Sequence, residues 1–131
     1  MTASSRSYVD ALFGLQGRSA IVTGASRGIG KAIAEGMALA GATVTGVARS
    51  DPDGGNLPPS MSYRKCDVTD ARAFSQICAV AAEAHGSIDV LVNAAGISLP
   101  NSLEQDAVDR FERTIAVDLS GVYRCSLEAL Q

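Results

Sequence analysis

A glycine-rich stretch at residues 23–30, Thr-Gly-Ala-Ser-Arg-Gly-Ile-Gly, constrains the fold more than any other part of the chain. The apolar run at residues 19–22 precedes it, and a helical pattern at residues 31–40 follows it. We therefore expect a strand, a glycine-rich turn and a helix in succession. In that arrangement backbone N–H groups and the positive end of a helix face one point, which favours a bound phosphate group.

The three glycines of this stretch have separate expected roles. Gly24 lets the chain turn sharply off the strand, Gly28 lets the backbone approach an anion, and Gly30 lets the helix pack closely on the strand. Ser26 and Arg27 add a hydroxyl and a cation at the same place. The spacing is Gly-x-x-x-Gly-x-Gly, which is neither the common Gly-x-Gly-x-x-Gly dinucleotide fingerprint nor a P-loop. On the loop alone, an ordinary structural turn remains the alternative.

Length and composition indicate one globular domain and exclude several partners. The 131 residues are 47% hydrophobic and 19% charged, which is typical of a soluble protein. A formal net charge of -3 gives no reason to expect nucleic acid or an acidic membrane surface as a partner. No apolar run approaches membrane-spanning length, and no secretory signal opens the chain. Cys66, Cys78 and Cys125 are widely spaced, so we expect free thiols in a cytoplasmic protein and no metal site.

Apolar runs alternate with helical patterns along the chain, which predicts an α/β domain built on a parallel sheet. Strands are expected at residues 19–23, 43–47, 62–65 and 88–92. Helices are expected at residues 28–40, from an N-cap at Thr69 to Gly86, and from residue 106 to the end. The expected strand order is 3-2-1-4, which leaves the fourth strand as an edge. Residues 1–16 are interpreted as a loosely ordered leader and residues 17–131 as the domain.

The second predicted strand ends in Ala48-Arg49-Ser50 and carries no acid at this point. In dinucleotide sites an acid here accepts hydrogen bonds from the adenosine ribose and repels a 2′-phosphate. Arg49, together with Arg27, therefore favours a 2′-phosphate, and with it NADP(H) over NAD(H). The alternatives are a solvated surface arginine, or one neutralised by the neighbouring Asp51.

From about residue 12 to residue 131 the chain resembles the N-terminal half of a short-chain dehydrogenase/reductase. The segments that match this family, in its order, are residues 23–30, 66–69, 89–96 and 115–123. The resemblance implies a Rossmann-type doubly wound parallel sheet, truncated after the fourth strand and its following helix. It also implies hydride transfer between nicotinamide and a carbonyl or alcohol substrate. The most similar members are acyl-carrier-protein ketoreductases and sugar or steroid dehydrogenases.

The same resemblance implies which residues bind the dinucleotide cofactor. The pyrophosphate and adjoining ribose are implied to lie on the glycine-rich stretch, at Gly24, Ala25, Ser26, Arg27, Gly28, Ile29 and Gly30. The 2′-phosphate is implied to lie at Arg49 and Ser50, the adenine between Asp67 and Val68, and the adenosine side along Asn93, Ala94, Ala95 and Gly96. For Asp67 the alternative is an exposed charge at the start of a helix.

One departure from the family concerns Asp118, where the family usually has an Asn that supports a proton relay. An ionised Asp accepts hydrogen bonds but cannot donate them, so the relay is expected to be altered. The alternative is an Asp that only perturbs local packing.

A second departure is the missing catalytic set. The family's catalytic Ser and Tyr-x-x-x-Lys pair belong downstream of the last residue, and the three tyrosines present are followed four places on by Leu12, Asp67 and Leu127. Without that pair no group protonates the carbonyl oxygen, so we expect the 131 residues alone to be inactive. Family members commonly associate through the helix at residues 106–131, which predicts a homo-oligomer. The alternative function is a non-enzymatic nucleotide-binding or oligomerisation module.

Overall fold

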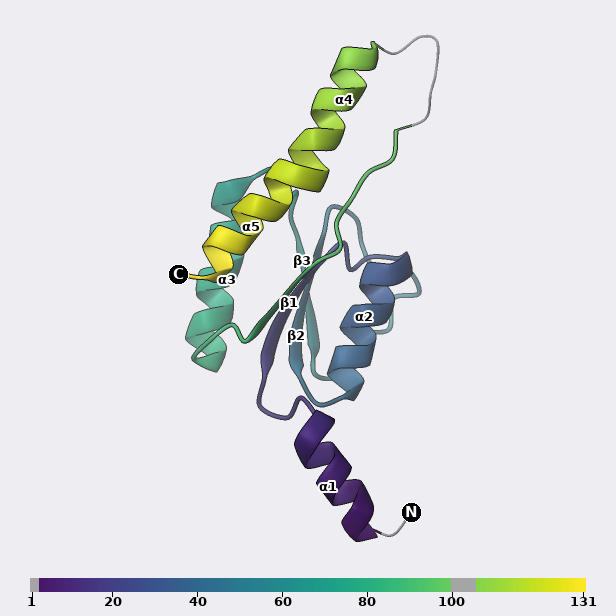
Figure 1. Cartoon of the computed structure of the whole chain (residues 1–131), viewed down its shortest axis with the longest axis vertical. Coiled ribbons are helices and arrows are strands. Elements are labelled where there is room, and N and C mark those ends of the chain that lie inside the picture. Colours follow the sequence, from purple (N-terminus) through teal and green to yellow (C-terminus); the bar gives the residue numbers. More distant parts are fainter. Residues whose placement is uncertain (1–2, 100–105) are drawn as a thin grey trace.

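The computed structural model describes residues 3–99 and 106–131, which form one parallel sheet with helices on both faces (Figure 1). The strands are β1 (Ser19–Thr23), β2 (Thr43–Ala48), β3 (Met61–Lys65) and β4 (Val90–Asn93). The helices are α1 (Ala3–Phe13), α2 (Gly28–Leu39), α3 (Ala71–His85), α4 (Ala107–Ile115), the π-helical segment η1 (Ala116–Gly121), and α5 (Val122–Ala129). Residues 1–2 of the predicted leader and 100–105 of the predicted domain lie outside the described residues.

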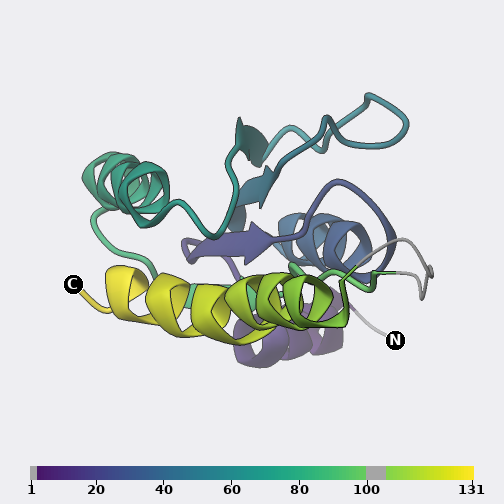
Figure 2. The same ribbon diagram turned by 90° about the horizontal axis from the view of Figure 1, so that it is seen from above.

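The strand order β3-β2-β1-β4 confirms the predicted order, and each neighbouring pair is parallel. β1 lies at the centre and is buried along its whole length. Its successive side chains point to opposite faces of the sheet, where they meet different helices. α2 covers one face, and α3 with α5 covers the other (Figure 2).

Each face of the sheet has its own apolar core. On the α2 face, the small residues Ala34 and Ala38 pack against Ala20 and Val22 of β1. On the opposite face, Phe74 of α3 is 1% exposed and packs with Ile21, Val47, Cys78 and Cys125. This two-sided burial explains why β1 is apolar without alternation.

The N-cap of α3 is Asp70 and not Thr69, so the predicted N-cap was wrong by one residue. The Asp70 carboxylate accepts a hydrogen bond from the Ala73 N–H at 3.0 Å. Thr69 instead donates its N–H and its hydroxyl to Asp67 Oδ1, at 2.9 and 2.8 Å. The helix ends at Gly86, whose φ of 83° is the left-handed conformation expected of a C-cap glycine.

The segment expected to be a loosely ordered leader contains a helix, α1, in its described residues. The helix projects away from the sheet (Figure 1), and its Tyr8, Leu12 and Phe13 side chains are exposed. Leu15 makes the docking contact, because its N–H donates to the Ala40 carbonyl at 2.8 Å and its side chain packs against the α2 core.

The predicted helix from residue 106 onward is present as the continuous rod α4–η1–α5 (Figure 1). Its π-helical segment was not predicted. Gly121 and Cys125 are buried toward the sheet and α3, and Ala129 packs against the same core. Across the described residues, no helix is long and apolar enough to span a membrane.

Candidate cofactor site

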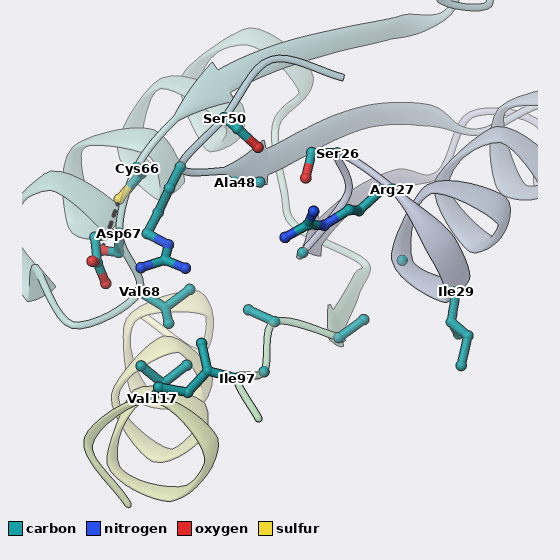
Figure 3. A pocket seen from close by; sticks show the side chains of 16 residues that line it. Ser26, Arg27, Ile29, Ala48, Ser50, Cys66, Asp67, Val68, Ile97 and Val117 are labelled. Carbon is teal, nitrogen blue, oxygen red and sulfur yellow. Dashed lines mark hydrogen bonds between the residues drawn. The ribbon is translucent and has the colours of Figure 1, made fainter. Parts of the chain in front are cut away.

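A cleft of about 310 Å³ opens where the carboxyl ends of the four strands meet (Figure 3). Its lining comes from the carboxyl end of each strand and the turn after it, from the first turn of α2 and from η1. The lining residues are Gly24, Ser26, Arg27, Ile29, Gly30, Ala48, Arg49, Ser50, Cys66, Asp67, Val68, Ala94, Ala95, Gly96, Ile97 and Val117. Ligands of open parallel sheets bind at this edge, beside the point where the strand order reverses.

Most of the residues predicted to bind a cofactor lie around this one cleft. The exceptions are Ala25, Gly28 and Asn93. The cleft also contains Ala48, Cys66, Ile97 and Val117, which sequence reasoning missed. These are small or apolar side chains without a chemical signature, and three of them adjoin predicted residues, so extending each predicted turn by one residue would have found them.

Ala25 and Asn93 are turned away from the cleft by bonds to the rest of the fold. Ala25 is fully buried in the α2 core, and its N–H donates to the Val47 carbonyl at 3.2 Å. The Asn93 amide donates to the Ser126 hydroxyl at 3.1 Å, which ties β4 to α5. Gly28 is exposed at the first turn of α2 with a φ of 57°, and a Cβ there would meet no atom within 4 Å.

Gly24 and Gly30 have the backbone roles that the sequence predicts. Gly24 has a φ of 69°, and a Cβ there would lie 2.5 Å from the Ala94 carbonyl oxygen. A Cβ at Gly30 would collide with the Gly24 carbonyl oxygen. The chain therefore turns off β1 and packs α2 against the turn only because both positions lack a side chain.

The start of α2 differs from the starts of α3 and α4, because no side chain caps it. Arg27 is the N-cap residue and makes no side-chain capping bond, whereas Asp70 and Asp106 cap α3 and α4. The first turn of α2 also contains no acidic residue. Its first N–H groups have no intrahelical partner and point outward with the positive end of the helix dipole. A bound anion can supply the missing acceptor.

Thr23 organises the floor of the cleft, a role that no pattern in the sequence indicated. Its hydroxyl accepts hydrogen bonds from the N–H groups of Ala94 and Ala95, at 3.2 and 3.1 Å. The same hydroxyl donates to the Val92 carbonyl at 3.4 Å. Thr23 is 1% exposed, so one buried side chain fixes the turn after β4 against the end of β1.

The charged residues that line the cleft are two cations, Arg27 and Arg49, and one anion, Asp67. Asp51, which could have neutralised Arg49, instead pairs with Lys65 at 2.8 Å. The pKa of Asp67 is lowered, chiefly by the hydrogen bond from the Thr69 N–H and in smaller part by the positive charge of Arg49. The cleft therefore has an excess of positive charge at neutral pH.

The labelled side chains around the cleft form two groups (Figure 3). Ser26, Arg27 and Ser50 gather on one side, and Asp67, Val68, Ile97 and Val117 lie on another. Ile29 points away from these groups and is 79% exposed.

Asp118 is not among the residues that line the cleft. Its Oδ1 atom accepts a hydrogen bond from the Ile97 N–H at 2.9 Å, so it anchors the segment after β4 to η1. This bond needs an acceptor only, which either Asp or Asn provides.

The three cysteines are free, buried and unsuited to nucleophilic chemistry. Burial raises the pKa of Cys78 and of Cys125 to about 11, and it raises the pKa of Cys66 as well. All three thiols therefore stay protonated at neutral pH. Among residues 3–99 and 106–131, no group of His, Cys, Asp and Glu side chains is arranged to hold a metal ion.

Comparison with known proteins gives relatives that share this architecture. The chain is 36% identical over 121 aligned positions to 3-oxoacyl-acyl-carrier-protein reductase of Vibrio harveyi, covering 89% of this chain and 50% of the relative. It is 34% identical over 131 aligned positions to D-threitol dehydrogenase of Mycolicibacterium smegmatis, covering 94% and 50%. The chain thus spans about half the length of the curated relatives it matches.

Solved structures give the same result. Aldohexose dehydrogenase of Thermoplasma acidophilum superposes with a TM-score of 0.78 at 35% identity, over 88% of this chain and 44% of that one. A dehydrogenase/reductase of Sinorhizobium meliloti superposes with a TM-score of 0.81 at 32% identity, over 95% and 52%. The sequence model of the family described as "short chain dehydrogenase" matches residues 18–131, which include all four strands and every residue that lines the cleft. By its sheet order, its glycine-rich turn and this match, the chain belongs to the short-chain dehydrogenase family.

Proposed function

We propose that this chain is the cofactor-binding half of an oxidoreductase that prefers NADP(H) to NAD(H). The observation that supports this most directly is the end of β2, where Arg49 and Ser50 line the cleft and no acid is present. Arg27 adds a second cation to the same cleft, and Asp51 is occupied by Lys65. A 2′-phosphate would find two positive charges and a hydroxyl at this place.

The residues present fit a dinucleotide. The uncapped start of α2 offers N–H donors to an anion, and the bare backbone at Gly24 leaves the floor of the cleft open. In the proposed arrangement the turn from Gly24 to Gly30 holds the pyrophosphate, and Asp67 with Val68 holds the adenine. Ala94, Ala95 and Gly96 leave space for the adenosine because their side chains are small or absent.

When bound, the nicotinamide dinucleotide supplies hydride transfer to or from a carbonyl or alcohol carbon of a small substrate. The described residues bind and orient the cofactor. The Tyr-x-x-x-Lys pair of the family does not occur in these 131 residues, so we infer that they bind the cofactor without turning it over. The substrate of the parent enzyme belongs to the carbonyl or alcohol class.

Calorimetric titration with NADP and with NAD tests the cofactor preference. The wild-type chain is expected to bind NADP at least about tenfold more tightly than NAD. Arg49→Ala is expected to weaken NADP binding by about ten- to a hundredfold, because a charge-assisted hydrogen bond contributes about 1.5–3 kcal/mol. NAD binding should change by less than about threefold, since NAD has no 2′-phosphate.

Arg72→Ala is the matched control, because Arg72 is an exposed arginine of α3 outside the cleft lining. It removes the same charge and should leave both affinities unchanged. Equal wild-type affinities for NADP and NAD would remove the proposed preference, and so would an equal loss in the Arg49→Ala and Arg72→Ala variants.

An association role is the second candidate, and the exposed apolar side of α4–η1–α5 favours it. Val108, Phe111, Leu119 and Tyr123 recur at helical spacing and are 60–65% exposed. We propose that this surface, here called the α4–α5 apolar face, pairs with a second copy of the chain.

Three unpaired, buried cysteines fit a reducing cytoplasm, which is the proposed location.

A further inference from the structure

Tyr63 lies outside the cleft but joins two of the segments that form it. It is the central residue of β3 and lies opposite Gly46 of β2 in the parallel register. A Cβ at Gly46 would lie 3.1 Å from Cδ2 of Tyr63, so the missing side chain lets the aromatic ring lie against β2. The ring also packs against the α2 core, which fixes its direction.

The Tyr63 hydroxyl lies near residues of two segments that line the cleft. It donates a hydrogen bond to the Ser50 carbonyl at 2.6 Å, and the nearby Ser26 side chain acts to lower the pKa of its phenol. Burial raises the pKa of Tyr63, so the phenol keeps its proton at neutral pH and remains a donor. Ser26 belongs to the glycine-rich turn and Ser50 to the end of β2, and both line the cleft (Figure 3).

Other bonds also join these segments, and one of them is the Ala25 N–H bond to the Val47 carbonyl at 3.2 Å. The Asp53 N–H donates to the Ser26 carbonyl at 2.8 Å, which brings the loop after β2 over the glycine-rich turn. The ion pair between Asp51 and Lys65 has side chains that are 77% and 58% exposed, so it contributes little. The Tyr63 hydroxyl adds a short but exposed hydrogen bond, 2.6 Å long, to the backbone at Ser50.

We propose that Tyr63 is a positioning residue that sets the distance between Arg49–Ser50 and the glycine-rich turn for recognition of a 2′-phosphate. The inference rests on the proposed NADP preference and adds a residue that touches no part of the cofactor. With the Ser50 carbonyl held, the Arg49 side chain starts from a fixed backbone position. Without that bond, Arg49 and Ser50 have to be ordered by the ligand itself, which costs binding free energy.

The test is Tyr63→Phe, which keeps the ring against β2 and removes only the hydroxyl. The variant is titrated with adenosine 2′,5′-bisphosphate and NADP, and separately with adenosine 5′-monophosphate and NAD. Ligands with a 2′-phosphate are expected to bind about five- to tenfold more weakly, and ligands without it should change by less than about twofold. Tyr8→Phe removes the same hydroxyl from the exposed helix α1 and is the matched control.

A double variant asks whether Tyr63 acts through Arg49. If it does, Tyr63→Phe introduced into the Arg49→Ala chain should weaken NADP binding by less than about twofold, because the group that it positions is already gone. Circular dichroism and thermal unfolding check that every variant is folded.

The possible outcomes separate this inference from the proposed function. If the wild-type chain prefers NADP and Tyr63→Phe leaves the size of that preference unchanged, the inference is overturned and the proposed function is not. Equal weakening of NADP and NAD also overturns it, because that result indicates a general structural role. A wild-type chain without preference refutes the proposed NADP specificity, and the inference fails with it.

Discussion

Thr23 and Gly24 bring the ends of β1 and β4 so close together that the floor of the cleft is built from backbone. The Thr23 hydroxyl holds the N–H groups of Ala94 and Ala95, and Gly24 leaves no room for a side chain against the same turn. Thr23 and Gly24 thus both contact the turn at Ala94 and Ala95. A change at either one moves the turn after β4 and alters the shape of the cleft.

The substitution Gly24→Ala tests this contact. It is expected to lower the free energy of unfolding by about 2 kcal/mol or more, because a left-handed alanine is itself unfavourable and the new Cβ meets backbone atoms that cannot rotate away. Urea unfolding followed by circular dichroism measures the loss.

Gly36→Ala is the control for Gly24→Ala, because a Cβ at Gly36 meets nothing within 4 Å and the residue lies inside α2. It is expected to raise the free energy of unfolding by about 0.5–1 kcal/mol, since alanine is the better helix former. A Gly24→Ala chain as stable as wild type would show that the turn moves freely.

Local sequence was enough to place the turns that form the site, but not every side chain within them. Gly24 and Arg49 could be predicted because each follows an apolar strand, whereas Asp67 was expected only from the family resemblance. The outward turn of Asn93 depends on α5, which is more than thirty residues further along the chain. The linking role of Tyr63 depends on its register opposite Gly46, and such a register follows from the assembled sheet rather than from either strand alone.

At the scale of elements, the rod α4–η1–α5 has one side made of small residues and another made of large apolar ones. Gly121 and Cys125 face the core, and a Cβ at Gly121 would lie 3.1 Å from the Val68 side chain. The large residues of the α4–α5 apolar face stay in solvent. Exposed apolar surface of this extent is typical of an association site.

Phe111→Asp tests pairing through this face. Sedimentation of the wild-type chain is expected to show a concentration-dependent dimer, and Phe111→Asp should weaken it by about tenfold or more, because each copy loses a buried aromatic ring. Val80→Asp is the matched control, since Val80 is 54% exposed on α3, outside the α4–α5 apolar face. A wild-type chain that sediments as a monomer at every concentration contradicts the pairing.

The elements themselves could largely be predicted from the sequence, and the reasons are local. β1 was placed without error because an apolar run ends at a glycine, and α2 and α3 were each placed within a few residues. The π-helical segment could not be predicted, because the apolar spacing on both sides of it is ordinary helical spacing. Helix α1 was missed because its sequence has no strong apolar face to dock on the domain.

At the scale of the whole molecule, the sheet has β3 at one edge and β4 at the other. Within the described part of the chain β4 pairs with β1 alone, and its residues are all partly exposed. The relatives that match this chain are about twice as long. The described part of the chain therefore carries the cleft on a sheet with an open edge strand.

Turnover is the property that we expect this chain to lack. In an assay of NADPH oxidation with a panel of ketones, the purified 131 residues should give no rate above the background, because no Tyr-x-x-x-Lys pair is present to protonate the product oxygen. Binding of NADPH, followed by fluorescence in the same preparation, is the control for a folded site. Measurable oxidation that rises with the concentration of the chain would contradict the expectation.

The uncapped start of α2 has an energetic consequence for the whole chain. A helix whose first backbone N–H groups have no acceptor within the protein is less stable than a helix with a side-chain N-cap. A ligand that fills this position contributes directly to the folding equilibrium, by about 2.7 kcal/mol at a hundred times its dissociation constant. Under the proposed function, the melting temperature of this protein rises with the concentration of nucleotide, and the nucleotide-free chain is its least stable form.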